Sequence, residues 1–312
     1  MKQIFLIVSA FIFGTASAVA QYPDTLINSP DSSFQQNVPQ ANDQPRINFN
    51  TYFALLGNDA KLAITKPFHM SKQDWGRVGI FAAALGTLAL ADRPIQRYAV
   101  DLRTRSNGLQ KVSKQVTRFG SIYGIYTIGA LTVASFVSRD EKMQTTTLLA
   151  TQSLIMTGAL ETVVKFLTGR QRPYFIDSTN VPPRPIFYGP FHKAPRDQNG
   201  KRTNTSFPSG HAALSFAVAT VYAREYKNKP WVPVVAYSAA GLISLSRITE
   251  NRHWATDLLA GAALGYLSGR LVTNNWHHYA YMKFRKKGNG TLRFNLQYNQ
   301  GQIMPGLTYT FD

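Results

Sequence analysis

Six apolar stretches of helical length follow one another after residue 76, and they limit the possible folds more than any other feature. Each stretch is rich in Ala, Leu, Gly and Val, a composition typical of helices that pack into a bundle. The stretches cover residues 78–91, 121–137, 145–164, 211–223, 231–246 and 254–273. The pattern predicts an all-α protein whose core is a bundle of about six helices.

An up-and-down bundle would bring three polar segments of this chain to the same end. The segment Lys165–Pro173 follows the third stretch, and the segment Pro208–His211 opens the fourth. The segment Ser246–Asp257 joins the fifth stretch to the sixth. Because the ends of antiparallel neighbours alternate, we expect all three segments to meet.

The second segment, Pro208-Ser209-Gly210-His211, predicts the start of a helix that can hold an anion. Pro208 suits a junction between loop and helix, and Ser209 is a favourable N-cap residue. The unpaired N–H groups of a helix start attract an anion, and the small Ser209–Gly210 pair lets it approach. His211 would stand beside that anion with a ring that can give or take a proton near neutral pH. Taken alone, these four residues are more often an ordinary capped helix.

Three cations in the other two segments would complete a site for a phosphate dianion. Lys165, Arg172 and Arg247 supply about the charge that a phosphate monoester needs in a partly desolvated pocket. A simpler interpretation pairs Lys165 with Glu161, one turn earlier, and leaves the two arginines as solvated loop charges. Glu161 could also orient Lys165 within the same site.

The two histidines are expected to do different work. His253 and Asp257 share a helix face if a helix begins near His253, so the carboxylate can accept from one ring nitrogen. The other ring nitrogen is then free to act as a nucleophile. His211 would protonate the leaving oxygen and later activate water.

Together the three segments read K-x6-RP, PSGH and SR-x5-H-x3-D, and all eleven specified positions are matched in this order. This pattern resembles the type 2 phosphatidic acid phosphatase superfamily, which also contains bacterial acid phosphatases and vanadium haloperoxidases. The resemblance extends from about Gly76 to Val272 and is to the bacterial phosphatase branch. The catalytic residues that it implies are His253, His211 and Asp257. The phosphate-binding residues that it implies are Lys165, Arg172, Ser209, Gly210 and Arg247.

The resemblance implies a metal-independent phosphatase that works through a phospho-histidine on His253 and needs no cofactor. The substrate would be a lipid phosphate, an isoprenyl diphosphate, a lipid A phosphate or a small soluble phosphoester. Vanadate would inhibit such an enzyme, or would be the cofactor if the chain were a vanadate-dependent haloperoxidase. A further alternative is a non-enzymatic, basic envelope-binding protein, although binding alone would need only the cations.

Four regions are predicted along the chain. Residues 1–20 have the basic start, apolar run and Ala-Val-Ala end of a secretory signal peptide, which predicts export to the periplasm. Residues 21–48 are rich in Gln, Asn, Ser and Pro and are expected to form a disordered tether. Residues 49–287 would form the helical phosphatase domain. Alternating apolar residues in 288–312 predict a short C-terminal β-hairpin.

The formal net charge of +18 indicates an anionic partner. The sequence contains no recognised nucleic-acid-binding motif, so a phosphorylated lipid or an anionic membrane surface fits better. A basic connection at 92–119 and a Pro-rich loop at 174–206 belong to the predicted active end, where they could attract or cover a substrate. The oligomeric state does not follow from the sequence.

The length of the apolar stretches bears on membrane insertion. Three of the six are shorter than the roughly 20 residues of a membrane span, and several contain Gln, Ser or Thr. A cleaved signal peptide followed by six spans would also place the active end in the cytoplasm, whereas membrane members of the family have it outside. We therefore expect a periplasmic helical domain that leans on the membrane, with an integral membrane bundle as the alternative.

Overall fold

The computed structural model describes residues 45–120, 122–174, 184–192, 202–287, 291–299 and 302–310. All of these residues belong to one structural unit, which extends from Ala41 to Asp312. The predicted signal peptide, and the predicted tether up to residue 44, lie outside the described residues.

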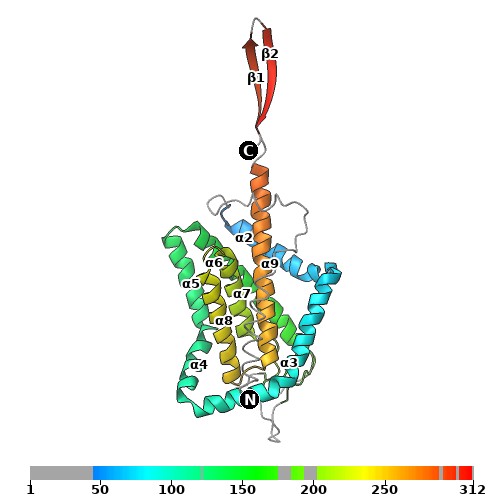
Figure 1. Ribbon diagram of the computed structural model, residues 1–312, viewed down its shortest axis with the longest axis vertical. Coiled ribbons are helices and arrows are strands. Elements are labelled where there is room, and N and C mark those ends of the chain that lie inside the picture. The colour runs from blue at the N-terminus through cyan, green and yellow to red at the C-terminus, as the bar shows by residue number, and fades with distance from the viewer. Residues whose placement is uncertain are drawn as a thin grey trace. The chain divides into compact units, whose positions relative to one another are not determined.

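Helices form most of the described chain, as the sequence predicts (Figure 1). They are α2 (Phe49–Thr65), the 3-10 helix η3 (Lys66–His69), α3 (Lys72–Arg105), α4 (Asn107–Phe119), α5 (Ile122–Val137), α6 (Glu141–Thr168), α7 (Gly210–Glu225), α8 (Trp231–Thr249) and α9 (Ala255–Lys287). Apart from residues 121 and 254, each apolar stretch lies within one of the helices α3 and α5 to α9. The helix α2 precedes them, and α4 occupies part of the basic connection 92–119.

Capping residues fix the ends of several helices. Ser71 begins α3 with a capping box, in which its side chain and that of Asp74 each accept from the other's backbone N–H. Ser209 begins α7, where its hydroxyl accepts from the N–H of Ala212 in the N-cap role that the sequence predicts. The helix α6 ends at Gly169, which adopts a left-handed conformation with a φ of 54°. Local sequence therefore determines where α6 stops and α7 starts, at the first two polar segments.

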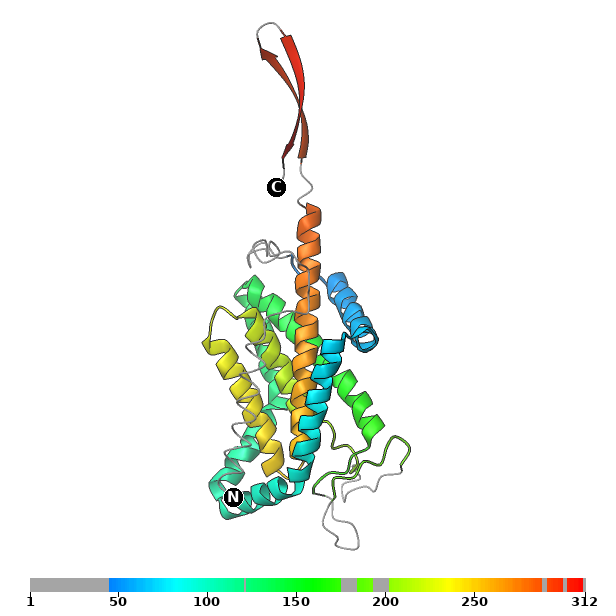
Figure 2. The same ribbon diagram turned by 45° about the vertical axis from the view of Figure 1, so that its right-hand side comes forward.

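The helix α7 lies inside the bundle and contacts α6, α8 and α9 (Figures 1 and 2). Glycines occupy every fourth position of α9 from Gly261 to Gly269, and they face α7. A Cβ atom at Gly265 would overlap the carbonyl oxygen of Ala213, so a larger residue would push the helices apart. Since α7 and α9 both begin at the predicted site, these glycines set the distance between the first turns of the two helices there.

Several polar residues of α6 are buried in the bundle, and several of its large apolar residues are exposed. The buried polar residues are Thr146, Thr147, Gln152, Ser153 and Thr157. The residues that are more than half exposed are Ile155, Val163, Phe166 and Leu167. This is the reverse of the pattern of a helix that faces water. The Ser, Thr and Gln content of this stretch therefore does not oppose a membrane location, contrary to our inference from the sequence.

Among the residues that the structure describes, three helices, α3, α6 and α8, are long and apolar enough to cross a membrane. They contain 34, 28 and 19 residues, respectively. The stretches 78–91 and 231–246, which fall short of a span in the sequence, are thus parts of longer helices.

Two strands lie in the C-terminal region. They are β1 (Thr291–Asn299) and β2 (Gln302–Thr310), and they pair with each other in antiparallel orientation. In this register Leu292 lies opposite Tyr309, and Phe294 lies opposite Leu307.

Candidate active site

The three polar segments lie together at one end of the helical bundle, the lower end in Figures 1 and 2. The backbone N–H of Ser209 donates to the carbonyl oxygen of Asp257 at 2.9 Å, which joins the second segment to the third. The N–H of Ser206 donates to the carbonyl oxygen of Arg170 at 3.0 Å, which joins the first segment to the residues before the second. Segments far apart in the sequence are thus linked directly by their backbones.

Lys165 lies in the last turn of α6 and faces the first turn of α7. Its Nζ atom forms an ion pair with Glu161, one turn earlier. A Cβ atom at Gly210 would overlap Oε1 of Glu161 and lie 3.4 Å from Nζ of Lys165. The ion pair therefore coexists with a position beside the Ser209–Gly210 turn, and Glu161 holds the lysine there.

The two arginines approach from the first and third segments. The Nε atom of Arg172 donates to Oγ1 of Thr205 at 3.2 Å, and its Nη2 atom donates to the Thr205 carbonyl oxygen at 3.1 Å. Arg247, near the end of α8, is buried and donates to Oγ1 of Thr117 in α4 at 3.4 Å. The Nε atom of Arg247 has no hydrogen-bond partner among the described residues, which leaves a donor for an anion. Neither arginine is a freely solvated loop charge.

His211 lies in the first turn of α7 and packs against the end of α4. A Cβ atom at Gly120 would lie only 2.7 Å from Cδ2 of its ring, so the residue after α4 must be small. Burial, followed by the positive charge of Arg247, lowers the pKa of His211 to about 3. His211 is therefore neutral near neutral pH, and an anion beside it is needed to raise its pKa and make it an acid.

The His253 ring contacts a backbone carbonyl oxygen through Nδ1, and Asp257, its predicted partner, lies slightly farther away. Its Nδ1 atom is 2.8 Å from the carbonyl oxygen of Ser206 and 3.5 Å from Oδ2 of Asp257. Because a carbonyl oxygen can only accept, Nδ1 carries the hydrogen and Nε2 keeps a free lone pair. Burial lowers the pKa of His253 to about 4, against the opposing effect of Asp257. The ring is thus neutral near neutral pH, with Nε2 available as a nucleophile.

A comparison with known families covers this part of the chain. Residues 146–280 match the sequence model described as the PAP2 superfamily. The matched region contains all three polar segments. Over these residues the chain is similar to the PAP2 superfamily.

Three curated proteins are similar to this chain over shorter regions. The lipid A 1-phosphatase of Porphyromonas gingivalis is 44% identical over 95 residues, which are 28% of this chain and 21% of that protein. The phospholipid phosphatase homolog 1.2 homolog of Caenorhabditis elegans is 33% identical over 125 residues, 34% of this chain and 37% of that protein. The bacitracin transport permease protein BcrC of Bacillus licheniformis is 36% identical over 69 residues, 22% of this chain and 32% of that protein. The chain thus spans between about a fifth and just over a third of the length of these relatives.

Two solved structures resemble this chain as well. The crystal structure of a transmembrane PAP2 type phosphatidylglycerolphosphate phosphatase from Bacillus subtilis gives a TM-score of 0.43 at 23% identity, over 67% of this chain and 92% of that chain. The crystal structure of Aquifex aeolicus LpxE gives a TM-score of 0.41 at 21% identity, over 59% of this chain and 94% of that chain.

Sequence reasoning missed two charged residues of the candidate active site, Arg170 and Asp92. Arg170 donates from Nη1 to Oδ1 of Asp257 at 2.5 Å and from Nη2 to Oδ2 of Asp92 at 2.6 Å. The position of Arg170 inside the first segment is a signal that could have singled it out. Asp92 lies in α3, far from the segments in sequence, and only the folded chain brings it to Arg170.

Part of the Pro-rich loop 174–206 packs on the first segment. The N–H of Gln171 donates to the carbonyl oxygen of Ile186 at 3.0 Å, and the N–H of Tyr188 donates to that of Gly169 at 3.2 Å. These bonds fix residues 184–192 beside the site. Residues 175–183 and 193–201 of the loop lie outside the described residues.

The carboxylates of the candidate active site are engaged by cations. Glu161 pairs with Lys165, and Asp257 pairs with Arg170. Across the described ranges, no group of three or more His, Asp or Glu side chains is arranged to hold a metal ion.

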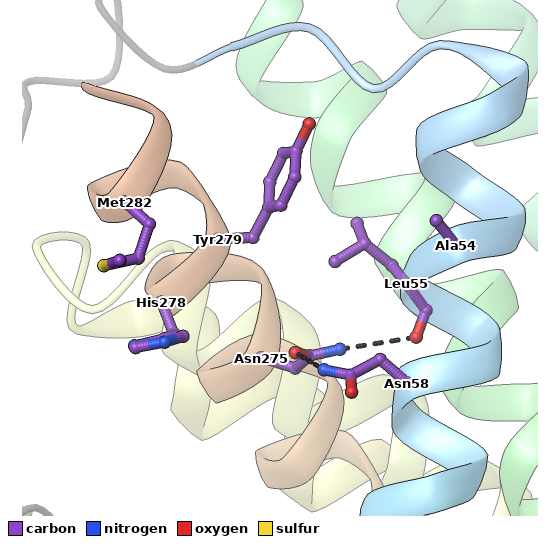
Figure 3. A pocket seen from close by; sticks show the side chains of 7 residues that line it. All are labelled: Ala54, Leu55, Asn58, Asn275, His278, Tyr279 and Met282. Carbon is purple, nitrogen blue, oxygen red and sulfur yellow. Dashed lines mark hydrogen bonds between the residues drawn. The ribbon is translucent and has the colours of Figure 1, made fainter. Parts of the chain in front are cut away.

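A shallow cavity of about 310 Å³ lies away from these segments, between α2 and α9 (Figure 3). Its lining residues are Ala54, Leu55, Asn58, Asn275, His278, Tyr279 and Met282. Asn275 accepts from Nδ2 of Asn58 at 2.6 Å and donates to the carbonyl oxygen of Leu55 at 3.3 Å. Because its lining contains no residue of the three segments, this cavity is separate from the candidate active site.

Proposed function

We propose that this chain is a metal-independent phosphatase that hydrolyses a phosphomonoester or diphosphate through a phospho-histidine on His253. The observation that carries the proposal is the state of the His253 ring, which is neutral and presents a bare Nε2 atom at the end of the bundle where the cations gather. A binding protein for anions would need the cations but no free imidazole nitrogen held in this way.

In this proposal the phosphate dianion is held by side-chain cations and by a helix start. Lys165, Arg172 and Arg247 balance its charge, and the first N–H groups of α7, at Gly210 and His211, point towards it. The carboxylates nearby are already paired with cations, so the phosphate is bound without competition from free negative charges. Charge neutralisation would therefore come from the chain itself.

The reaction then proceeds in two displacements. The Nε2 atom of His253 attacks phosphorus, the new P–N bond forms, and the bond from phosphorus to the leaving oxygen breaks. His211, whose pKa is raised by the bound dianion, gives its proton to that oxygen. In the second step His211 takes a proton from water, which attacks phosphorus and breaks the P–N bond. Inorganic phosphate is released, and His253 returns to its neutral state.

We further propose that the substrate is a phosphorylated lipid and that the bundle lies in a membrane. The reversed polarity of α6 and the length of α3, α6 and α8 support a lipid environment. One similar protein is named a lipid A 1-phosphatase, and another is named a phospholipid phosphatase homolog. Because the predicted signal peptide indicates export, and six full spans after it would place the active end in the cytoplasm, we propose that the bundle enters the membrane from the periplasmic side without six full spans. The active end then stays in the periplasm.

Phosphate release from several substrates tests the proposed function. We expect purified protein in detergent to release phosphate from phosphatidic acid, from an isoprenyl diphosphate or from lipid A, and from p-nitrophenyl phosphate. Activity should survive excess EDTA, and vanadate should compete with the substrate. Loss of activity on chelation, restored by a divalent ion, would contradict the metal-free mechanism. Bromide oxidation with peroxide and vanadate, without phosphate release, would instead favour a haloperoxidase, and neither activity would favour a binding protein.

A basic surface on α4 supports an anionic membrane partner near the site. A shallow hollow of about 290 Å³ is lined by Lys111, Lys114, Gln115 and Arg118, all exposed. The opposite face of the same helix carries Thr117, which contacts Arg247. We propose that the hollow contacts anionic lipid headgroups while the inner face supports the active site.

Removing two lysines from this hollow should weaken action on anionic vesicles. A basic residue near an anionic surface contributes about 1 kcal/mol, so Lys111→Ala with Lys114→Ala should raise KM on phosphatidylglycerol-rich vesicles by roughly tenfold or more. The kinetics with p-nitrophenyl phosphate should not change. The matched control is Lys61→Ala with Lys66→Ala, which removes the same charge from exposed positions in α2 and η3. An equal rise in KM for the control pair would show that only net charge matters.

A further inference from the structure

We propose that Arg170 and Asp92 are positioning residues that hold Asp257, and through it His253, in the geometry that leaves Nε2 free. This inference rests on the proposed function, because it assigns a task within that reaction. The unit is a buried clamp of one guanidinium between two carboxylates, formed by Asp92, Arg170 and Asp257. It joins α3, the first polar segment and the first turn of α9.

Every member of the clamp is tightly engaged. Arg170 is 2% exposed, and both carboxylates are 0% exposed. Asp92 also accepts from the N–H and the Oγ1 atom of Thr256, at 3.0 and 2.7 Å. Asp257 accepts from Oγ of Ser206 at 2.5 Å through its second oxygen. The position of Asp257 is therefore fixed from several directions.

Arg170 is unsuited to bind phosphate, although it belongs to the same segment as Arg172. Its Nη1 atom contacts Asp257 and Thr256, and its Nη2 atom contacts Asp92. Its guanidinium also lies 4.7 Å from the ring centre of Phe187. Both terminal nitrogens are occupied by protein groups and only the buried Nε atom lacks a partner, so this arginine cannot make a forked contact with two phosphate oxygens. Its charge acts on Asp257 instead.

The clamp explains the hydrogen bonding of His253. A bare carboxylate 3.5 Å from Nδ1 would compete for the ring hydrogen. Arg170, Ser206 and the N–H of Trp254 all donate to Asp257, which disperses its charge and fixes its direction. The ring hydrogen can then go to the carbonyl oxygen of Ser206, and Nε2 stays free. When Nε2 carries a phosphoryl group, the nearby carboxylate still stabilises the positive charge that develops on the ring.

A buried charge cluster is weak support for stability as such. Two carboxylates and one guanidinium lose hydration on burial, and apolar residues of similar volume are often as stable. In addition, the Nε atom of Arg170 has no hydrogen-bond partner among the described residues. The arrangement is thus better explained by the position that it gives to Asp257 than by a contribution to folding.

The clamp is tested by removing the charge of Arg170 and then, in a second variant, by also removing the carboxylate that this charge balances. In Arg170→Met, two buried carboxylates face each other without their cation, so one of them should take up a proton. We expect kcat with p-nitrophenyl phosphate to fall about 10- to 100-fold, a typical loss for a residue that orients a reacting group. KM and the vanadate inhibition constant should change little, because the phosphate-binding cations remain. The acid limb of the pH profile should move to higher pH, since the loss of the cation raises the pKa of Asp257.

The double variant Asp92→Asn with Arg170→Met should recover much of the lost kcat, because it removes the carboxylate that the cation had balanced. Arg77→Met is the control: it breaks an arginine–carboxylate pair with Asp74, at 3.1 Å, in the first turns of α3 and outside the clamp, and kcat should stay near the wild-type value. If Arg170→Met does not fold, Arg170→Lys retains the charge but not the fork, and an intermediate kcat is expected.

Nitrogen NMR of the His253 ring gives a readout that does not depend on phosphatase activity. We expect hydrogen on Nδ1 in the wild-type protein and a change of tautomer or protonation in Arg170→Met. An unchanged ring and an unchanged kcat in a folded variant would overturn the clamp. A rise in KM and in the vanadate constant at constant kcat would also overturn it, since Arg170 would then bind phosphate. If the ring signals change but wild-type protein releases no phosphate, the proposed function fails and the clamp stands.

Discussion

Replacing His253 with Gln is expected to remove nearly all turnover with every substrate while the protein stays folded. In the proposed mechanism the ring supplies the atom that attacks phosphorus, and no second nucleophile takes its place. Loss of an enzyme nucleophile can cost about 10⁶-fold in kcat, so a loss of at least 10⁴-fold is expected here. The measurement is phosphate release under saturating substrate, together with the unfolding temperature of each variant.

The matched control is His277→Gln. His277 pairs with Glu225 at 2.9 Å in another part of the bundle, and its loss should leave turnover near the wild-type value. Asp257→Asn should cause a smaller loss than His253→Gln, because the nucleophile is present but poorly supported. Wild-type turnover in a folded His253→Gln protein would remove the basis for the phospho-histidine.

The effect of replacing His211 with Ala should depend on the leaving group. An alkyl or lipid alkoxide leaves poorly and needs a proton in the transition state, whereas nitrophenolate leaves well without one. General acid catalysis is typically worth about 10²- to 10⁴-fold, so the first step with a lipid phosphate should slow by about that factor. The first step with p-nitrophenyl phosphate should slow much less. Single-turnover kinetics with both substrates measure the two losses separately.

His253→Gln provides the contrast for this experiment. No substrate can avoid the nucleophile, so that variant should fail equally with both leaving groups. Equal losses for both substrates in His211→Ala would mean that His211 does not act as the acid. Because the pKa of His211 is lowered to about 3, its ring is neutral in the free protein. His211 can therefore act as an acid only after the dianion has bound.

The sequence predicts the meeting of the three segments because the required information is local. Helix length and alternation fix which ends face the same way, while Ser209 and Gly169 fix where two of those helices start and stop. His253 and Asp257 lie close because only three residues separate them, although α9 begins only at Ala255. Such features do not depend on the details of side-chain packing.

The clamp and the carbonyl partner of His253 could not be predicted in the same way. Asp92 reaches Arg170 only because α3 packs against α9, and no residue near Asp92 in sequence marks that contact. The Ser206 carbonyl lies beside His253 because a loop returns to the first segment. Both contacts depend on tertiary packing across many intervening residues.

The membrane location of α6 could not be predicted from the sequence for a similar reason. The sequence gives the average hydropathy of the α6 stretch but not the direction of each side chain. In the structure Gln152 and Thr157 point inwards, while Phe166 and Leu167 point outwards. Polar residues that lower the average hydropathy therefore line the interior, and the outer surface is more apolar than the average indicates.

The most direct test of the central claim is to look for a phosphoryl group on His253. His211→Ala protein would be mixed with p-nitrophenyl phosphate, quenched under alkaline conditions that preserve phospho-histidine, digested and examined by mass spectrometry. Because this variant lacks the base for the second step, we predict a burst of nitrophenol and one phosphoryl group on the peptide that contains His253. The same peptide from His211→Ala with His253→Gln should carry none. A burst with the phosphoryl group on another residue, or turnover without any phosphorylated peptide, would contradict the mechanism.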